Sequence, residues 1–392
     1  MKPYRITGNY ERTSVGGEDV SAFVPRPLPP SEPPFAMDAA MQERLDAAEE
    51  ALRRLALAAQ MVPSQDWFLY GFVRKEAVVS SQIEGTQATL EDLLHFEAQD
   101  SHTISPDTDV REICNYLEAL DYARDQLSRK DGLPLSMRLL NEAHIRLMRG
   151  ARGGDKMPGE IRRSQNWIGG TRPGNASYVP PPAHLLAPLL SEFESFIHAE
   201  CGLLPLVRIG LLHVQFETIH PYLDGNGRIG RLLITLLLDH WNLLPVPLLY
   251  LSLFFKRHRQ EYYRRLAAVR TEGDWEGWTN YFLEGVATIG EEAVSTAREL
   301  FSLTSRDRAA VLSRPGSTVM AARLFEMLPR HPVLTIAGAM KLLGTTRPTA
   351  AKAVATLAET GVLASPPGKK RDRVFAYTAY LDILKAGTGL QE

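Results

Sequence analysis

The stretch of sequence that decides the fold is His220-Pro-Tyr-Leu-Asp-Gly-Asn-Gly-Arg-Ile-Gly-Arg231. Before it, residues 206–219 carry apolar side chains at helical spacing, and after it residues 228–241 continue with a second apolar helical pattern. Gly225-Asn-Gly-Arg-Ile-Gly230 also matches the dinucleotide fingerprint G-x-G-x-x-G, but that fingerprint needs a buried strand before it and a parallel sheet around it. The helical context excludes such a sheet, so the stretch predicts a loop that joins two buried helices.

This loop carries groups that suit a phosphate ligand. Gly225, Asn226 and Gly227 allow backbone N–H groups to point inward, next to the positive N-terminus of the following helix. Arg228 and Arg231 are spaced i, i+3, so both guanidinium groups reach the same face of its first turn, and each offers a planar fork for phosphate oxygens. These residues predict an anion-binding turn.

Two further side chains add chemistry to the turn. Asp224 supplies a hard oxygen ligand where a Mg²⁺ ion bridging phosphates would lie. His220 carries an imidazole, the kind of side chain that can accept a proton near neutral pH without help from its surroundings. A base, a metal carboxylate, an anion nest and two arginines together predict a phosphate-transfer site. The alternative interpretation is a tight turn between helices with a buried, hydrogen-bonded histidine, which would suit any one of these residues taken alone.

The stretch resembles the Fic motif, H-x-F-x-[DE]-G-N-G-R-x-x-R, with Tyr222 in place of the usual phenylalanine. The exchange is expected to be mild, because this aromatic side chain should pack beneath the loop. The resemblance extends from about residue 60 to 290, and it implies a protein adenylyltransferase that moves AMP from ATP to Ser, Thr or Tyr hydroxyls, its own included. It further implies that His220 is the catalytic base and that Asp224 holds Mg²⁺. The nucleotide-binding residues that it implies are Gly225, Asn226, Gly227, Arg228, Gly230 and Arg231.

A second pattern, Ser80-Ser-Gln-Ile-Glu-Gly85, is similar to the inhibitory signature of the same family, [ST]-x-x-x-E-[GN]. Ser80 and Glu84 are four residues apart on a predicted helix, and Gly85 is a natural end for that helix. The resemblance implies that Glu84 pairs with Arg231 and occupies the room that the γ-phosphate of ATP needs. The alternative is an exposed helix end with a solvated carboxylate.

Two further features support the same resemblance less specifically. Residues 165–180 have aromatic and β-branched residues on either side of a Gly/Pro/Asn turn, which predicts an irregular hairpin. The hairpin resembles the flap of the family, which could dock a protein target by strand addition. The alternative interpretation is a plain surface hairpin. Tyr262 and Tyr263 lie where relatives line the nucleoside pocket, and they suit core aromatic positions equally well.

The predicted fold is mostly α, a Fic-type helical core with a small β-hairpin flap and a C-terminal winged-helix domain. We expect an N-terminal arm and regulatory region over 1–108, a catalytic core over 109–300 and the winged helix over 315–392. The first 34 residues are rich in Pro, Gly and Ser, which favours an extended arm. Of the first three hundred residues, only 165–180 has the pattern of strands. Helices are predicted at 37–63, 67–81, 109–129, 135–149, 183–199, 206–219, 228–241, 256–270 and 275–299.

The C-terminal region has the pattern of a winged helix. Helical segments at 317–329, 335–343 and 347–360 have a bend at Gly344, and two short strands are expected near Gly361 and Val374. The loop between these strands ends in Lys369-Lys-Arg-Asp-Arg373, a basic wing that could contact DNA phosphates. Such domains also serve in dimerisation or protein docking, so a homodimer and a DNA partner are both open.

The composition and the first residues of the sequence indicate the class of protein and its cellular location. Of the 392 residues 44% are hydrophobic and 23% charged, the net charge is −2, and the two cysteines form no ligand cluster. The N-terminus has no apolar signal run, so we expect a cytoplasmic protein without a membrane segment.

Two rival functions stay open. One is an ATP-sensing winged-helix transcriptional regulator without catalysis, for which His220 would be unnecessary. The other is a de-AMPylase, in which Glu84 helps water to remove AMP.

Overall fold

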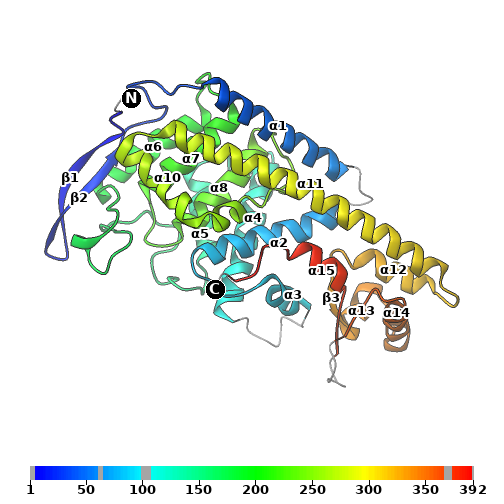
Figure 1. Cartoon of the computed structure of the whole chain (residues 1–392). Coiled ribbons are helices and arrows are strands. Elements are labelled where there is room, and N and C mark those ends of the chain that lie inside the picture. The colour runs from blue at the N-terminus through cyan, green and yellow to red at the C-terminus, as the bar shows by residue number, and fades with distance from the viewer. Residues whose placement is uncertain (1–4, 61–64, 99–106, 366–372, 391–392) are drawn as a thin grey trace. The chain divides into compact units, whose positions relative to one another are not determined.

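The computed structural model describes residues 5–60, 65–98, 107–365 and 373–390 (Figure 1). The chain is mostly helical with a small antiparallel hairpin, which confirms the predicted fold class. The winged-helix assignment of the C-terminal region stays a prediction. Within the described residues, no helix combines the length and the apolar character needed to cross a membrane.

The chain groups into two compact units. One contains the residues up to Arg53, Asn115–Pro245 and Phe254–Ile289, and the other contains Arg54–Cys114, Val246–Leu253 and the residues from Gly290 onward. This grouping follows spatial proximity and takes each unit from several chain segments. The predicted division into an N-terminal region, a core and a C-terminal domain stays a prediction.

The first unit is built around helices α7 and α8, which follow one another and pack together. Every residue of α7 from Leu206 on is buried except Glu217, which is typical of a helix with apolar side chains all round. The helices that belong to this unit, wholly or for the larger part, are α1 (Ala39–Gln60), α4 (Thr108–Ser128), α5 (Met137–Leu147), α6 (Leu186–His198), α7 (Pro205–Ile219), α8 (Asn226–His240), α9 (Ser252–Arg257) and α10 (Arg259–Glu272).

The prediction of an extended N-terminal arm was wrong. Strands β1 (Gly8–Val15) and β2 (Glu18–Pro25) pair along their whole length as an antiparallel hairpin, with Val15 opposite Glu18. The two residues of the turn, Gly16 and Gly17, have φ angles of 59° and 85°. A two-residue turn with two positive φ angles matches the twist of the flanking strands, so Gly-Gly favours this hairpin.

The predicted hairpin at 165–180 exists in a reduced form. Its two arms meet in one antiparallel bridge, where Ile168 and Tyr178 exchange both backbone hydrogen bonds (2.8 and 3.1 Å), and a 3₁₀ turn, η1 (Pro173–Asn175), lies at its tip. A further 3₁₀ turn, η2 (Ala183–Leu185), leads into α6. We call residues 165–180 the flap. The N–H of Phe23 in β2 donates to the carbonyl of Val179 (2.9 Å), so the N-terminal hairpin pairs with one edge of the flap.

The second unit contains the remaining helices and the second sheet. Its helices, wholly or for the larger part, are α2 (Gln65–Ile83), α3 (Leu90–Ala98), α11 (Trp275–Ser313), α12 (Val319–Met327), α13 (Ile336–Leu343), α14 (Arg347–Glu359) and α15 (Thr378–Leu384). Helix α3 was not predicted, although Thr89 and Asp92 form a reciprocal capping box: Asp92 N–H donates to Thr89 Oγ1 (3.2 Å) and Thr89 N–H to Asp92 Oδ2 (2.8 Å).

Two predicted helices of the core differ from those observed. The helix expected at 256–270 is interrupted at His258, which separates α9 from α10. Helix α11 continues fourteen residues beyond the predicted end at 299, to Ser313, because Leu300, Leu303 and Val311 extend its buried face.

The C-terminal segments largely follow the prediction. Helices α12, α13 and α14 form as expected, and Gly344 ends α13 in a left-handed conformation. Strand β4 (Val374–Ala376) pairs antiparallel with β3 (Val333–Thr335), which was not predicted. The strand expected near Gly361 is reduced to one antiparallel bridge, in which Ala364 and Ala376 of β4 exchange both backbone hydrogen bonds (2.9 and 2.8 Å). The N–H groups of Val362 and Leu363 instead return to the carbonyl of Leu357 at the end of α14. Of the predicted basic wing, only its last residue, Arg373, lies within the described residues.

Candidate active site

The predicted catalytic loop joins the end of α7 to the start of α8. His220 follows α7 with φ 50° and ψ 62°, and its N–H donates to the carbonyl of Phe216 (2.9 Å). For a residue other than glycine this left-handed conformation costs about 1–2 kcal/mol. A fold that keeps a non-glycine residue in such a conformation needs surrounding bonds that hold it there.

The loop is closed by one buried side chain. The Asn226 amide donates through Nδ2 to the carbonyl of Tyr222 (2.8 Å) and accepts through Oδ1 from the N–H of the same residue (2.8 Å). Gly225 precedes α8 in the left-handed conformation (φ 76°), and a Cβ there would lie 2.8 Å from Met148 Sδ. The amide of Asn226 therefore shapes the loop, and the first backbone N–H groups of α8 are the groups that a helix leaves available to an anion.

Tyr222 packs beneath the loop, as predicted. Its ring is fully buried and stacks on His144 of α5, with ring centroids 3.9 Å apart and an interplanar angle of 9°. Its hydroxyl donates to Oδ1 of Asn141 (2.7 Å), one turn earlier on the same helix. Asn141 thus satisfies the hydroxyl that distinguishes tyrosine from phenylalanine here, so the exchange leaves no buried polar atom without a partner.

His144 supports the loop in one defined tautomer. The N–H of Gly159 donates to its Nδ1 (2.8 Å), so the ring proton is on Nε2, which donates to the carbonyl of Asp224 (3.0 Å). Burial lowers the pKa of His144 to about 4, and the positive charge of Arg228 adds to the effect. The imidazole is therefore neutral at pH 7 and acts as a fixed donor to the loop.

The charged side chains of the motif gather on the first turn of α8. Arg228 and Arg231 are both buried, at 4% and 2% exposed. Arg228 Nη2 lies 3.9 Å from Asp224 Oδ1 and 3.7 Å from Met148 Sδ. Asp224 accepts from the N–H of Gly225 (2.7 Å) through one carboxylate oxygen. Two buried guanidinium groups thus lie beside a helix N-terminus, and both the guanidinium groups and the helix dipole favour a negatively charged ligand there.

The second oxygen of Asp224 has a partner that was not predicted. Lys156, in the loop after α5, places Nζ 3.1 Å from Asp224 Oδ2. Both side chains are partly exposed, at 49% and 35%. A cation therefore already lies against the carboxylate that the sequence assigned to magnesium.

Two of the predicted nucleotide-binding positions, Gly230 and Tyr262, lie deeper than the loop. Gly230 faces α7, where a Cβ would lie 2.4 Å from Glu217 Oε1, and its carbonyl is 3.0 Å from His213 Nδ1. The other ring nitrogen of His213 pairs with the Tyr262 hydroxyl (2.8 Å). Tyr262 is 1% exposed, which favours the core interpretation for it, whereas Tyr263 is 43% exposed.

The flap is tied to the catalytic loop through its side chains. The hydroxyl of Tyr178 donates to the carbonyl of Thr218 in the last turn of α7 (2.5 Å), and Asn166 Nδ2 donates to the carbonyl of Leu223 (3.3 Å). Arg162, just before the flap, donates from Nε to the carbonyl of His220 (2.9 Å). The structure thus brings the flap and the catalytic loop together.

The inhibitory pattern lies in the second unit. Ser80 is buried in the last turns of α2, Glu84 follows the end of that helix, and its N–H donates to the carbonyl of Ser81 (3.0 Å). Gly85 has φ 98°, which confirms the predicted helix end. Arg231 belongs to the first unit, and its pairing with Glu84 stays a prediction.

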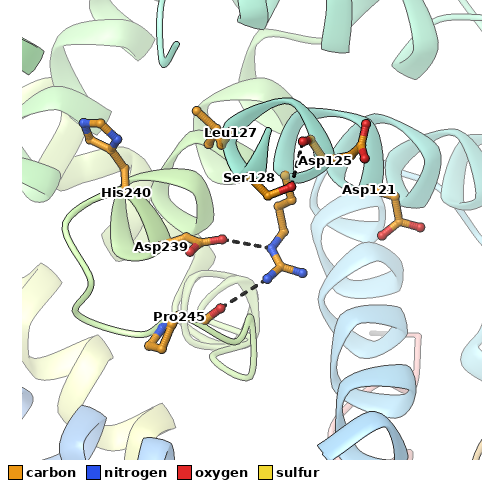
Figure 2. Close-up of a pocket in the computed structure, with 8 residues that line it drawn as sticks. Asp121, Asp125, Leu127, Ser128, Asp239, His240 and Pro245 are labelled. Atoms are coloured by element: carbon orange, nitrogen blue, oxygen red, sulfur yellow. Dashed lines mark hydrogen bonds and ion pairs between the residues drawn. The ribbon is translucent and has the colours of Figure 1, made fainter. Parts of the chain in front are cut away.

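A separate cavity of about 590 Å³ lies at the other end of α8 (Figure 2). Arg124 of α4 lines it and donates to Asp239 Oδ2 (3.1 Å) and to the carbonyl of Pro245 (3.2 Å). Helix α8 has 15 residues, so this end is about 20 Å from the catalytic loop. The guanidinium is already bonded on both sides, and the cavity is distinct from the predicted site.

Sequence reasoning missed the residues that support the site from elsewhere in the chain. They lie in α5 or between α5 and the flap, and they are Asn141, His144, Met148, Lys156 and Arg162. The spacing of Asn141 and His144 places both on one face of a helix that begins at the capping residue Ser136. That pattern could have suggested a polar face on α5, although not its partners.

Comparison with protein families matches two consecutive stretches of the chain. Residues 42–125 match the Fic/DOC family N-terminal model, and residues 134–238 match the Fic/DOC family model. The second match contains the whole catalytic loop together with α5, the flap and α7.

Curated relatives match part of the chain. The chain is 34% identical over 152 residues to the protein adenylyltransferase Fic of Culex quinquefasciatus, a match that covers 38% of this chain and 26% of the relative. It is 33% identical over 161 residues to the protein adenylyltransferase Fic of Drosophila willistoni, covering 41% of this chain and 28% of the relative. The chain thus spans about a quarter of the length of the curated relatives that it matches.

Solved structures share the fold. A Fic family protein from Desulfovibrio desulfuricans matches with a TM-score of 0.57 at 22% identity, over 88% of this chain and 97% of that chain. Fic-1 of C. elegans matches with a TM-score of 0.51 at 20% identity, over 66% of this chain and 73% of the other.

Proposed function

This chain belongs to the Fic/DOC family as a Fic-domain protein, and we propose that it transfers AMP from ATP to a hydroxyl group of a protein. The observation that carries the proposal is the loop between α7 and α8. In it His220, Asp224 and two buried arginines surround one helix N-terminus. Relatives named protein adenylyltransferase Fic support this reaction over nucleotide sensing alone.

The proposed reaction is a single displacement at phosphorus. The oxygen of a Ser, Thr or Tyr hydroxyl forms a bond to the α-phosphorus of ATP, and the bond from that phosphorus to the bridging oxygen of the β-phosphate breaks. The hydroxyl proton passes to His220, pyrophosphate leaves, and AMP stays on the protein. Arg228 and Arg231 would neutralise the β- and γ-phosphates, and the N–H groups at the start of α8 would hold the α- and β-phosphates.

The residues present fit a magnesium ion. Asp224 offers a carboxylate that is partly exposed and already attracts a cation, the Lys156 ammonium. Within the described residues no group of three His, Cys, Asp or Glu side chains could hold a metal. Magnesium does not require such a group, because it is typically held by one or two carboxylates and completed by phosphate oxygens and water. Bound there, the ion would neutralise charge on the phosphates of ATP.

We further propose that Glu84 inhibits the enzyme by pairing with Arg231 and taking the place of the γ-phosphate. The support is the pattern Ser80-x-x-x-Glu84-Gly85 and the helix end that forms at it. A carboxylate and a phosphate compete for the same guanidinium fork. Removing the carboxylate should therefore favour the productive pose of ATP.

The flap is the proposed docking edge for the target protein. Its Val179 edge already pairs with β2. Ile168 directs its N–H and its carbonyl toward Tyr178, so the carbonyl of Trp167 and the N–H of Gly169, which share planar trans peptide groups with them, point the other way. A target segment would add as a strand at that outer edge and bring its hydroxyl toward the catalytic loop.

The test is label transfer from [α-³²P]ATP with Mg²⁺, using wild type, Glu84→Gly and Glu84→Gly with His220→Ala. Self-labelling or labelling of cell lysate is the readout. We expect Glu84→Gly to raise labelling about tenfold or more, as when a competing interaction of about 1.4 kcal/mol is removed. Loss of His220 should then lower labelling about 10²–10⁴-fold.

Each outcome has a clear meaning. Glu43→Ala, which removes an exposed carboxylate on α1, is the control and should label like wild type. Full labelling by the double variant would contradict the role of His220. Absence of labelling in all variants, with ATP binding intact by calorimetry, would overturn the transferase proposal in favour of a nucleotide sensor. A de-AMPylase would show the reverse pattern, with Glu84 required for removal of AMP.

A further inference from the structure

Arg162 is a buried guanidinium whose partners are all carbonyl oxygens. It is 2% exposed and lies in the segment between α5 and the flap. Nε donates to the carbonyl of His220 (2.9 Å), Nη1 to that of Ser164 (3.1 Å) and Nη2 to that of Pro181 (2.6 Å). Its backbone N–H donates to the carbonyl of Pro221 (2.9 Å).

Such a position is unfavourable for a charge. Burial lowers the pKa of Arg162 to about 10, so the guanidinium stays protonated at pH 7. Among the described residues no carboxylate forms an ion pair with it. A buried charge without a counter-ion needs several well-directed dipoles around it, and here three carbonyls supply them. Packing alone would be served better by an apolar side chain.

The carbonyls that Arg162 binds belong to two functional parts. Those of His220 and Pro221 form the corner at the end of α7, where His220 has its left-handed conformation. The carbonyls of Ser164 and Pro181 lie at the two ends of the flap, immediately before and after residues 165–180. One residue therefore binds the backbone of the proposed catalytic base and both ends of the proposed docking edge.

We propose that Arg162 is a positioning residue that fixes the target-docking flap relative to His220, so that the hydroxyl of a docked target reaches the base and the α-phosphorus together. The inference rests on the proposed function for its catalytic consequence. Its structural part, the coupling of the flap to the His220 corner, is independent of that function. The planar fork of arginine is essential, because the three carbonyls face three different nitrogens, whereas an ammonium group has its three N–H donors on a single nitrogen.

The chain offers a matched control at the next position. Arg163 is 81% exposed at its side chain and pairs with Glu160. Arg162→Lys and Arg163→Lys make the same chemical change, one at the buried fork and one at the surface. Both would be made in the Glu84→Gly background, with Arg162→Gln as a second variant if Arg162→Lys does not fold.

Three measurements test the proposal. Hydrogen exchange of the folded variants should show faster exchange in both 164–181 and 219–223 for Arg162→Lys, and no change for Arg163→Lys. Label transfer should fall about 10²-fold for Arg162→Lys, as expected when reacting groups are misplaced by about 1 Å. The affinity for ATP, measured by calorimetry, should change less than twofold.

The outcomes separate this inference from the proposed function. If the parent labels and Arg162→Lys labels equally well, or loses ATP affinity in step with its rate, the positioning role is overturned. If the parent does not label, the proposed function fails. Hydrogen exchange then decides the coupling alone: joint loosening of the two segments supports it, and loosening of one or neither overturns it.

Discussion

At the scale of single residues, Lys156 and Asp224 form the contact with the most direct consequence for the site. The ammonium lies 3.1 Å from the carboxylate that we propose as a magnesium ligand, and both side chains are partly exposed. An exposed ion pair is weak, so a divalent cation can displace it, although the two cations compete for one oxygen. Lys156→Gln should therefore lower the magnesium concentration that half-saturates ATP binding by about two- to fivefold, measured by calorimetric titration.

Lys130→Gln is the control for this change, because Lys130 is an exposed lysine just beyond α4 and its loss alters the net charge equally. It should leave the magnesium requirement at the wild-type value. A magnesium requirement that is unchanged or higher in Lys156→Gln would show that Lys156 does not compete for Asp224.

At the scale of elements, the β1–β2 hairpin supports the flap. Besides the backbone bond to Val179, the carboxylate of Glu18 accepts from the N–H of Gly174 (2.9 Å) and from Arg172 Nη1 (2.7 Å) at the flap tip. A carboxylate that accepts from a backbone N–H orders that backbone. Glu18→Ala should therefore speed hydrogen exchange over 170–180 and weaken labelling of a protein target, while the affinity for ATP stays the same.

Glu11 on strand β1 provides the control for the Glu18→Ala change. Its carboxylate pairs with His184, outside the flap, at 3.3 Å. Glu11→Ala should leave exchange over 170–180 unchanged. Equal exchange in wild type and Glu18→Ala would mean that the hairpin leaves the flap unsupported.

At the scale of the whole molecule, the second unit joins the helix before Glu84 to the end of the chain. Leu384 of α15 is fully buried and packs directly on the backbone of α2 at Gly71, and Gln82 Nε2 donates to the carbonyl of Thr388 (3.1 Å). These contacts extend over about 16 Å of α2. Leu384→Ala should loosen that helix, because a large-to-small change in a core costs about 2–5 kcal/mol. Label transfer should then rise in the wild-type background.

The same change in the Glu84→Gly background should have little effect, since the proposed inhibitory carboxylate is already absent. Leu390→Ala, at an exposed position of the same segment, is the control. If Leu384→Ala alters labelling equally in both backgrounds, the C-terminal segment does not act through Glu84.

The sequence by itself determined the mostly helical fold and the loop between α7 and α8. Apolar periodicity located most of the helices, and the glycines of the loop signalled its tight turn. These signals are local, since a capping residue, a glycine or an apolar stripe acts within one or two turns of the chain. The Gly16-Gly17 turn is a local signal of the same kind, and it favours the β1–β2 hairpin. The proline and serine residues around it favoured an extended arm instead, so the hairpin was not predicted.

The tertiary structure decided which distant groups complete the site. His144 reaches the loop from 80 residues away and Arg162 reaches His220 from 58. The fold buries the side chain of Tyr262 and exposes that of Tyr263, although the two are adjacent in sequence and chemically identical. A buried polar side chain must find partners, but its type only says how many donors and acceptors it has. Which carbonyls it meets depends on how the helices and the flap pack, and that is a property of the folded chain.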